Sequence, residues 1–353
     1  MIEIIRYTFS GLGCLLILIS LLPLLPSNMW YVRIFDYPRS QKFWLNLAIT
    51  VLYIAILGFQ GPFDFIFVGA LLLNQIYLFR QIWDYTPLAP IQMKDYSQEG
   101  ETIRLFVANV YQDNRDANRC LALIEKCDPD LILMVETDKW WSDALKPLHA
   151  RYPHRILIPL ENTYGMVFLS RLKIARHEVR YLVDDDIPSI IVDLKTSKGQ
   201  LFRLYGLHPK PPVPGESEES TERDTEILIV GKEAKQCEMP VIVAGDLNDV
   251  AWSYTTSLFL KVSELLDPRI GRGFFSTFHA NYRLMRWPLD HVFCSSHFYL
   301  HALKRLPTIG SDHFPILIEI GLMPYEIPEN AKDEKRADAE DLEVAEEKIH
   351  ASD

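Results

Sequence analysis

Three long apolar runs near the beginning of the chain constrain its fold more than any other feature. They cover Phe9–Pro26, Phe43–Phe59 and Phe63–Phe79 and have 17 or 18 residues each, close to the shortest helix that crosses a bilayer. Aromatic residues cluster near the run ends, as is typical of interfacial anchors. They are Trp30, Tyr31, Trp44, Tyr53, Tyr77 and Trp83. The pattern predicts three transmembrane helices within residues 1–83.

Two alternatives to three spans are a soluble helical bundle and a cleaved signal peptide formed by the first run. Glu3 and the lack of a small-residue cleavage site disfavour the signal peptide. Three apolar runs in a row before a polar region disfavour the soluble bundle. We therefore expect an integral, multi-pass membrane protein, in an inner (plasma) membrane.

Basic residues between the runs bear on the orientation in the membrane. Arg33, Arg39 and Lys42 lie between the first and second runs, and no Lys or Arg lies between the second and third. With three spans, the first loop and everything after the third run share one side. Because loops rich in Lys and Arg face the cytoplasm, the pattern favours a cytoplasmic C-terminal domain. The five cysteines show no disulfide or metal spacing, which is compatible with a reducing compartment.

Composition divides the remaining chain into three parts. Residues 84–100 have the Pro and polar content of a linker. Residues 101–322 carry 26 basic and 30 acidic side chains, and residues 323–353 carry 4 and 11, which with a neutral first hundred residues gives the net charge of −11. The acidic tail has almost no large apolar residue after Ile327. It cannot bury enough surface to fold alone, so we expect it to be disordered or a frayed helix.

The segment 101–322 alternates short apolar strands with amphipathic helices. Helices are predicted over Asn114–Cys127, Trp140–His149 and Thr221–Cys237. Strands are predicted over Ile103–Val110, Leu131–Val135, Arg155–Ile158, Met166–Ser170, Val179–Leu182, Ile190–Leu194, Phe202–Leu207, Val241–Ala244, His291–Cys294 and Ile316–Ile320. This order predicts one α/β domain with mixed sheets, which is long enough to bury a large core.

The stretch Val241–Asp249 (VIVAGDLND) is a buried strand that ends in polar groups. Asp246 and Asn248 are two residues apart, so on an extended chain both can face the same way. A carboxylate and a carboxamide aimed at one point suit a hard cation and a phosphate oxygen. The alternative is a plain turn, because Gly, Asp and Asn are common turn residues.

Polar residues end several other predicted strands in the same way. They are Asn109, Glu136, His208, Asp290, Asp312 and His313. Each alone fits a bland role as a turn former, a helix cap or a packing residue. Together they are improbable as independent caps, because open α/β sheets place their sites at strand ends.

The order of these residues resembles the endonuclease/exonuclease/phosphatase superfamily, with its DNase I-like fold. The resemblance is carried by Asn109, Glu136 in VET, His208 in GLHP, Asp246 and Asn248 in GDLN, Asp290 in DHVF, and Asp312 and His313 in SDH. It covers about residues 101–322 and implies a four-layer α/β sandwich with a divalent metal at the upper edge of its two sheets. The three spans make the chain similar to membrane-anchored bacterial members.

The resemblance also implies a ligand set for Mg²⁺ or Mn²⁺. Glu136 would supply the main carboxylate, because both ions prefer oxygen ligands. Asn109 and Asp312 would be further ligands, directly or through water.

The remaining residues take the catalytic roles that the resemblance implies for phosphoester hydrolysis. Asp246 would orient or deprotonate the attacking water, and Asn248 would donate to a phosphate oxygen. His313 would stabilise charge or act as the acid, with Asp290 holding its tautomer. His208 would contact the phosphate or protonate the leaving group, and the division of labour between the two histidines stays open.

Three readings of the function stay open. The first is a nuclease-like phosphodiesterase, although a domain with more acidic than basic residues suits duplex binding poorly. The basic, aromatic stretch Gly271–Arg286 could bind a phosphate group or stack on a ring, or it could be a solvated loop. A phosphodiesterase or phosphatase acting on lipid or inositol-phosphate head groups is the second, favoured by the spans. A non-catalytic membrane scaffold is the third, and the complete set of acidic and imidazole positions argues against it.

Overall fold

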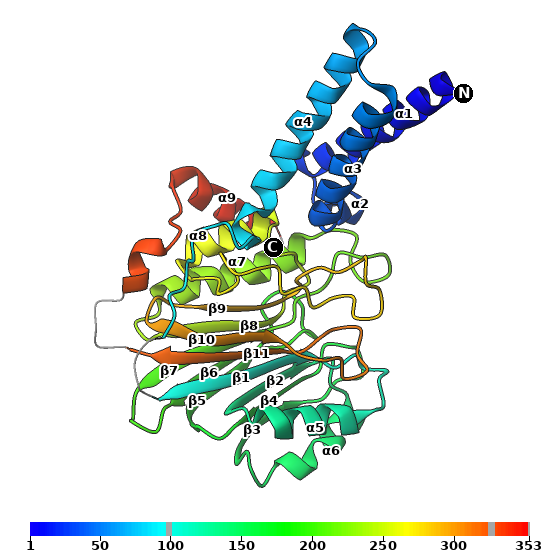
Figure 1. The fold of residues 1–353 in the computed structure, drawn as a ribbon. Coiled ribbons are helices and arrows are strands. Elements are labelled where there is room, and N and C mark those ends of the chain that lie inside the picture. The colour runs from blue at the N-terminus through cyan, green and yellow to red at the C-terminus, as the bar shows by residue number, and fades with distance from the viewer. Residues whose placement is uncertain (97–100, 324–328, 352–353) are drawn as a thin grey trace.

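The computed structural model describes residues 1–96, 101–323 and 329–351. Three long helices, α1 (Ile2–Leu21), α3 (Arg39–Leu57) and α4 (Pro62–Ile82), rise together from the rest of the molecule (Figure 1). Each is long and apolar enough to cross a membrane. Short helical turns join or follow them: η1 (Leu22–Leu24), α2 (Trp30–Arg33), η2 (Ile34–Asp36) and η3 (Trp83–Tyr85).

The three-helix unit has a small closed interior and an apolar exterior. Leu16, Tyr53 and Leu71 are buried where the helices meet. Asn46 is buried as well, and its amide donates to the carbonyl of Leu71 and to Gln75, which satisfies a polar group that would be costly in an apolar setting. Many large apolar side chains of the helices point outward instead, the arrangement expected of helices surrounded by lipid.

Two sheets form the body of the molecule. The first has the order β10-β11-β1-β2-β4-β3 and the second β5-β6-β7-β8-β9. The first sheet comprises β10 (Phe298–Arg305), β11 (Ile316–Leu322), β1 (Thr102–Asn109), β2 (Leu131–Val135), β4 (Met166–Ser170) and β3 (His154–Ile158). The second comprises β5 (Lys173–Arg180), β6 (Ser189–Lys195), β7 (Leu201–Leu207), β8 (Val241–Asp246) and β9 (Asp290–Cys294). The pairs β1–β2 and β7–β8 are parallel and the others antiparallel.

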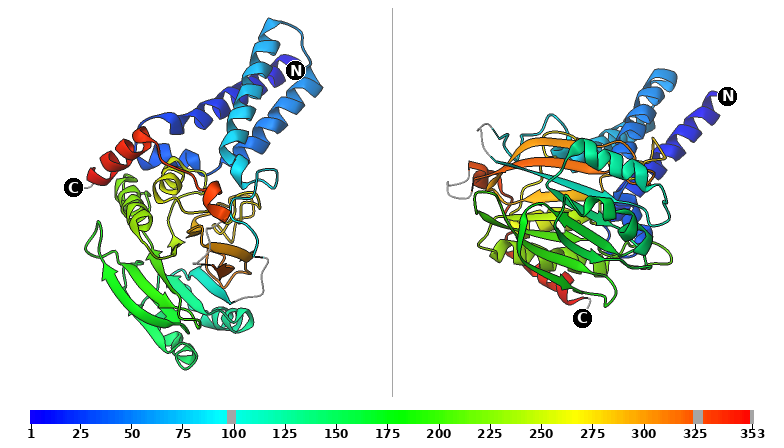
Figure 2. Two further views of the ribbon diagram at one scale, coloured as in Figure 1. Left: turned by 90° about the vertical axis from the view of Figure 1, so that its left-hand side faces the viewer. Right: turned by 90° about the horizontal axis from the view of Figure 1, so that it is seen from below.

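The two sheets pack face to face, and helices cover their outer faces (Figures 1 and 2). Alternating side chains of β1 show why: Leu105 and Val107 enter the core between the sheets, whereas Phe106 and Ala108 face α5 (Ala117–Cys127) and α6 (Lys139–Ala144, followed by η4, Lys146–Leu148). On the other side, α7 (Thr221–Gln236) and α8 (Tyr254–Ser263) cover the second sheet. This confirms the predicted four-layer α/β sandwich.

Some elements differ from those predicted. The strand predicted over Val179–Leu182 is β5, which begins earlier, and β10 and α8 were not predicted. Strand β5 is largely exposed at a sheet edge, so its sequence lacks an apolar run. Strand β10 has only its first three residues buried. Helix α8 carries threonines and serines on its buried side, which hides an amphipathic pattern.

The residues after the domain, expected to be disordered or a frayed helix, are helical and packed on the domain in their described part. In the described part, Glu329–Asp333 form η5 and Ala339–His350 form α9. Helix α9 begins with a capping box in which Asp338 and Asp341 exchange hydrogen bonds with backbone amides. Its Ala345 is buried against the layer formed by α7 and α8. Lys348 bonds to the buried Asp224 on α7 at 2.8 Å. The tail therefore gains from the domain surface the apolar burial that it lacks alone.

The stretch expected to be a linker also packs on the domain in its described part. Tyr85 and Met93 are buried, and the Tyr85 hydroxyl donates to the carbonyl of Ala251 at 2.6 Å. The amide of Tyr96 donates to the carbonyl of Leu300. Residues 97–100 lie outside the described residues. The path from α4 to β1 is therefore fixed by specific contacts up to residue 96.

Candidate active site

The topology brings the polar strand ends to one edge of the two sheets. Asn109 ends β1, Glu136 follows β2, His208 follows β7 and Asp246 ends β8. Strand β9 runs antiparallel to β8, and its first residue, Asp290, pairs with Asp246. Strand β11 runs antiparallel to β1, so the Asp312–His313 turn before it lies at the same edge. The structure therefore brings these residues together at one edge of the two sheets.

Backbone conformation at this edge is unusual. Glu136 and Asn248 have φ values of 59° and 50°, in the left-handed region that non-glycine residues rarely occupy. Gly245, with φ 145°, lies so close to the β7 backbone that a Cβ atom would be 1.9 Å from the carbonyl oxygen of Leu207. Only glycine fits there. Such strained positions concentrate at functional sites.

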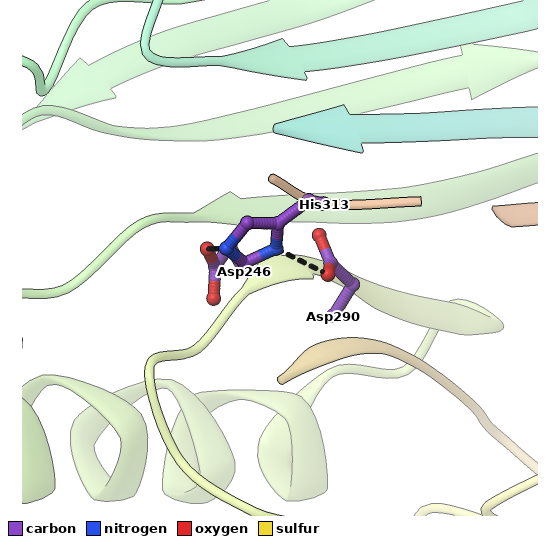
Figure 3. A group of neighbouring side chains, drawn as sticks. All are labelled: Asp246, Asp290 and His313. Atoms are coloured by element: carbon purple, nitrogen blue, oxygen red, sulfur yellow. Dashed lines mark hydrogen bonds and ion pairs between the residues drawn. The ribbon is translucent and has the colours of Figure 1, made fainter. Parts of the chain in front are cut away.

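The centre of the site is an Asp–His–Asp arrangement (Figure 3). His313 Nδ1 lies 2.8 Å from Asp290 Oδ2, and its Nε2 lies 3.5 Å from Asp246 Oδ2. All three side chains are buried. Burial alone would lower the pKa of His313, but Asp290 and Asp246 outweigh burial and raise the pKa to about 10. The imidazole is therefore held as a cation between two carboxylates.

Asn109 bridges two carboxylates of the site. Its amide nitrogen donates to Glu136 Oε1 at 2.7 Å and to Asp246 Oδ2 at 3.0 Å. Its amide oxygen accepts from the backbone of Tyr111 at 2.9 Å. In this orientation the amide nitrogen positions the two carboxylates, and the oxygen keeps one lone pair beyond the one given to Tyr111.

Glu136 is the most weakly stabilised charge of the site. Besides Asn109, its carboxylate accepts from the Gln112 amide at 3.1 Å. Burial nevertheless raises the pKa of Glu136 to about 7. Among the described residues, no Lys or Arg forms an ion pair with Glu136, Asp246, Asp290 or Asp312.

The second histidine differs from the first. His208 is buried, its ring lies 5.4 Å from that of Tyr164, and its Nδ1 has no hydrogen-bond partner among the described residues. Burial lowers the pKa of His208 to about 4. His208 is therefore neutral near pH 7, while His313 is charged.

Asn248 and Asp312 lie at the rim of this cluster. The Asn248 side chain donates to the carbonyl of Pro209 at 2.9 Å, and its backbone amide donates to Asp246 Oδ1 at 3.0 Å. Asp312 is half-buried next to His313, and it helps to raise the pKa of that histidine. Within the described part of the chain, its carboxylate accepts a hydrogen bond from the Ser311 hydroxyl at 3.4 Å and forms none with Glu136.

The donor set fits a divalent cation. Four acidic side chains converge, and His313 is the one cation among the described residues that pairs with any of them. The buried Asp290 Oδ1 has no partner among the described residues. Asp246, Asp290 and His313 offer atoms within 4.8 Å of one another. A histidine held as a cation is not a metal ligand, however, because ligation needs the neutral ring. The carboxylate oxygens around Glu136 are therefore the better place for a hard cation.

Several supporting residues had no signal in the sequence. Thr277 is buried and accepts from the amides of Leu289 and Asp290 at 3.2 Å each, which fixes the start of β9. Tyr37, which precedes α3, donates its hydroxyl to the carbonyl of Asn248 at 2.8 Å. Arg223 on α7 donates to the same carbonyl at 2.9 Å. Both bonds join segments far apart in the chain, so no local pattern could reveal them.

Comparisons with known proteins agree with this architecture. A family model described as "Endonuclease/Exonuclease/phosphatase family" matches residues 106–313. No curated protein sequence matches the chain.

Three solved structures illustrate the likeness of fold. The endonuclease/exonuclease/phosphatase from Bacteroides vulgatus is 16% identical with a TM-score of 0.52, covering 63% of this chain and 100% of that one. The human Nocturnin catalytic domain with bound sulfate is 18% identical with a TM-score of 0.50, covering 63% and 94%. TDP2 of D. rerio, complexed with a single-strand DNA product, is 18% identical with a TM-score of 0.52, covering 63% and 100%.

Proposed function

Because this chain belongs to the endonuclease/exonuclease/phosphatase family, whose members are phosphoester hydrolases, we propose that it is a membrane-anchored phosphoester hydrolase that depends on Mg²⁺ or Mn²⁺. The observation that carries the proposal is the convergence of four carboxylates around a single described cation, His313; they are Glu136, Asp246, Asp290 and Asp312. Burying several carboxylates together is costly unless a cation neutralises them.

Glu136 and Asp312 would hold the cation, with Asn109 fixing the Glu136 carboxylate. A bound Mg²⁺ or Mn²⁺ would neutralise charge on the phosphoryl oxygens and help to activate water. Asn109 is bonded to both Glu136 and Asp246, so it sets the distance between the metal site and the proposed water-activating carboxylate. This adds a positioning role to the predicted ligand role of Asn109.

Asp246 would orient and deprotonate the water that attacks phosphorus. The new P–O bond forms as the ester P–O bond breaks, and the departing oxygen takes up a proton. His313, charged and wedged between Asp290 and Asp246, would stabilise the negative charge that develops on the phosphoryl group. Asn248 has a second amide hydrogen beyond the one given to Pro209, which would donate to a phosphate oxygen.

His208 would act as a neutral hydrogen-bond donor to the substrate. Its lowered pKa makes it a poor general acid near pH 7. The charged His313 is in turn a weak acid because two carboxylates stabilise its proton. The geometry therefore favours charge stabilisation by His313 and substrate contact by His208.

The membrane anchoring rests on the three N-terminal helices. The loop between α1 and α3 contacts the body of the molecule directly through Tyr37, which supports the expectation that this loop and the sandwich share one side of the membrane. That this side is the cytoplasm stays a prediction, which rests on the basic residues of that loop.

Hydrolysis of bis(4-nitrophenyl) phosphate by the purified full-length protein tests the proposal. We expect turnover with Mg²⁺ or Mn²⁺ that stops on adding EDTA and is lost in Asp246→Ala. A folded wild-type protein that gives no turnover with either ion would support the scaffold reading instead. Full turnover by Asp246→Ala would refute the proposed role of this carboxylate.

A further inference from the structure

The catalytic edge of the sandwich lies at the foot of a transmembrane helix. Tyr37 precedes the first residue of α3, Arg39, by two positions, and its hydroxyl bonds to the backbone of Asn248 in the site. Arg39 itself donates to the carbonyl of Trp252, three residues beyond Asp249. The backbone that follows Asp246 is therefore bonded directly to the segment at the start of α3, where the three-helix unit meets the sandwich (Figure 1).

A loop of the site's rim, residues 279–286, connects the catalytic turn to the same helix. At its base, the amide of Ala280 donates to the carbonyl of Asp312 at 2.6 Å. At its tip, Gln41 in the first turn of α3 donates to the carbonyls of Leu284 and Arg286 at 3.1 and 3.3 Å. Since four residues reach at most about 14 Å, the Asp312–His313 turn lies within about 20 Å of the beginning of α3.

The tip of this rim loop presents apolar and basic side chains to the outside. Leu284 is 85% exposed, Tyr282 59% and Met285 54%. Arg283 is exposed and forms no hydrogen bond or ion pair with any other described residue. Large apolar side chains next to a free arginine suit the interface of a bilayer, where the apolar groups enter the acyl boundary and the guanidinium meets phosphate.

The depth of the loop matches the lipid phosphates. Gln41 lies just before the apolar part of α3, which begins at Phe43, so the bonded loop tip is level with the head-group layer. That layer is roughly 5–8 Å thick on each side of the bilayer. The charge of the sandwich does not favour nucleic acid, because residues 101–322 carry more acidic than basic side chains.

We propose that the rim loop lies in the head-group layer and that the substrate is a phosphoester in the head group of a membrane lipid, taken from the leaflet that the loop enters. This inference rests on the proposed hydrolase function and names its substrate class. Leu284 and Met285 contact the bilayer, while the site residues receive the phosphate from the side of α3.

Hydrolysis in three substrate forms tests the inference with the full-length protein. The first is ³²P-labelled lipid in vesicles of phosphatidylcholine, phosphatidylethanolamine and phosphatidylglycerol that contain the protein. The second is a monomeric short-chain phospholipid with the head group that is cleaved in vesicles. The third is bis(4-nitrophenyl) phosphate. The variant Leu284→Ser/Met285→Ser removes the apolar tip and touches no residue of the catalytic cluster.

We expect the double variant to lose about tenfold in turnover of vesicle lipid, because two apolar side chains no longer enter the bilayer. Its turnover of the monomeric lipid and of the reporter should change less than about twofold, which also shows that it is folded. Leu157→Ser is the matched control: Leu157 is a partly exposed leucine on β3, away from the site. That control should act like the wild type on all three substrates.

Two results would overturn the inference while leaving the hydrolase function intact. One is wild-type protein that cleaves the reporter or plasmid DNA but no lipid in vesicles. The other is a double variant that cleaves vesicle lipid as fast as the wild type. Absence of all turnover, reporter included, would overturn the proposed function together with the inference.

Discussion

Two buried clusters of charge lie at opposite ends of the four-residue stretch Asp246–Asp249. Asp249 is bonded to Thr256, at 3.1 Å, and to Ser253, and lies 3.4 Å from Arg223. Arg223 also pairs with Asp224 at 2.8 Å. We call Arg223, Asp224 and Asp249 the arginine cluster. Asp246, with Glu136, Asp290 and His313, forms the catalytic cluster.

One acid from each cluster shows how differently a carboxylate charge can be neutralised. Burial would raise the pKa of Asp224, but Arg223 and Lys348 outweigh it and lower the pKa to about 2. Burial raises the pKa of Glu136 to about 7, because its hydrogen bonds and the charge of His313 do not compensate. Asp224 is fully buried and Glu136 partly exposed, so the extent of burial does not identify the functional site. The excess of carboxylates over the one cation His313 does, since it favours a cation from outside the chain.

The largest expected effect separates the two aspartates at the ends of this stretch. Asp246→Asn should lower the turnover of bis(4-nitrophenyl) phosphate by about 10³-fold or more, because the proposed base is lost. Asp249→Asn should retain turnover within about tenfold but lose about 1–3 kcal/mol of unfolding free energy, because its hydroxyl donors and Arg223 lose their acceptor. Steady-state kinetics and thermal unfolding of both variants check this. Equal losses of activity in the two variants would contradict the distinction between a catalytic cluster and a structural one.

Substitution of Arg223 tests the arginine cluster through its cation instead of its carboxylates. Arg223→Met should destabilise the protein by about 3–5 kcal/mol, because Asp224 and Asp249 keep buried charge without their main partner. Urea unfolding followed by the fluorescence of the buried tryptophans measures the change. Arg119→Met is the control: Arg119 pairs with Asp116 on the surface of α5, where such pairs contribute about 0–1 kcal/mol. Similar losses in both variants would contradict a structural role specific to Arg223.

Metal addition should stabilise the catalytic cluster alone. At Mg²⁺ concentrations about 100 times the dissociation constant, the wild type should gain about 2.7 kcal/mol of unfolding free energy. Glu136→Gln should lose most of this gain, while its stability without metal stays the same or rises, because an unpaired buried carboxylate is removed. Thermal unfolding across a Mg²⁺ titration, with EDTA as the baseline, reports both. An undiminished Mg²⁺ effect in Glu136→Gln would place the cation elsewhere.

A further prediction concerns a third kind of buried acid, one near Arg180 and Asp184 but without an ion pair among the described residues. Glu226 on α7 is buried, its Oε1 has no partner among the described residues, and burial raises its pKa to about 8. The unfolded chain releases this proton near pH 4.3. The folded protein therefore holds an extra proton between these values, and its stability falls as the pH rises from about 4.5 through 8.

Glu226→Gln should flatten this pH dependence and make the protein more stable than the wild type above pH 8. Below pH 5 the two proteins should have nearly equal stability, since the glutamic acid is then protonated in both states. Melting temperatures at pH 5 and pH 9 provide the comparison. Parallel curves for the variant and the wild type would mean that Glu226 is not kept protonated by burial.

The sequence predicted the fold well because a buried strand is recognisable as a short run of apolar residues. Leu131–Val135 and Met166–Ser170 are continuous apolar runs, and both have the predicted bounds. Strand β5 and helix α8 were missed or misplaced, because an exposed edge strand and a helix with buried threonines carry no such run. The tail was expected to be disordered because its composition says nothing about the surface on which Ala345 packs.

The sequence predicted which residues form the site better than it predicted how their side chains are arranged. Residue type and position at strand ends identified Glu136, Asp246 and His313 as candidates. The orientation of Asn109, with its nitrogen toward the carboxylates, depends on the amide of Tyr111 and could not be read from the chain. The different charge states of His208 and His313 depend on which carboxylates surround each ring, a property of the folded sandwich.

The hydrogen bond from Tyr37 to Asn248 has a consequence for how this protein is prepared. A fragment that begins at residue 101 would look like a natural soluble version of the sandwich, yet it would lack the donor to Asn248. It would also lose Tyr85, whose hydroxyl bonds to Ala251, and would uncover Trp252, whose indole donates to the carbonyl of Asp36. Low activity or aggregation of such a fragment would therefore reflect the loss of these contacts with residues 1–100. It would not show that the longer protein is inactive.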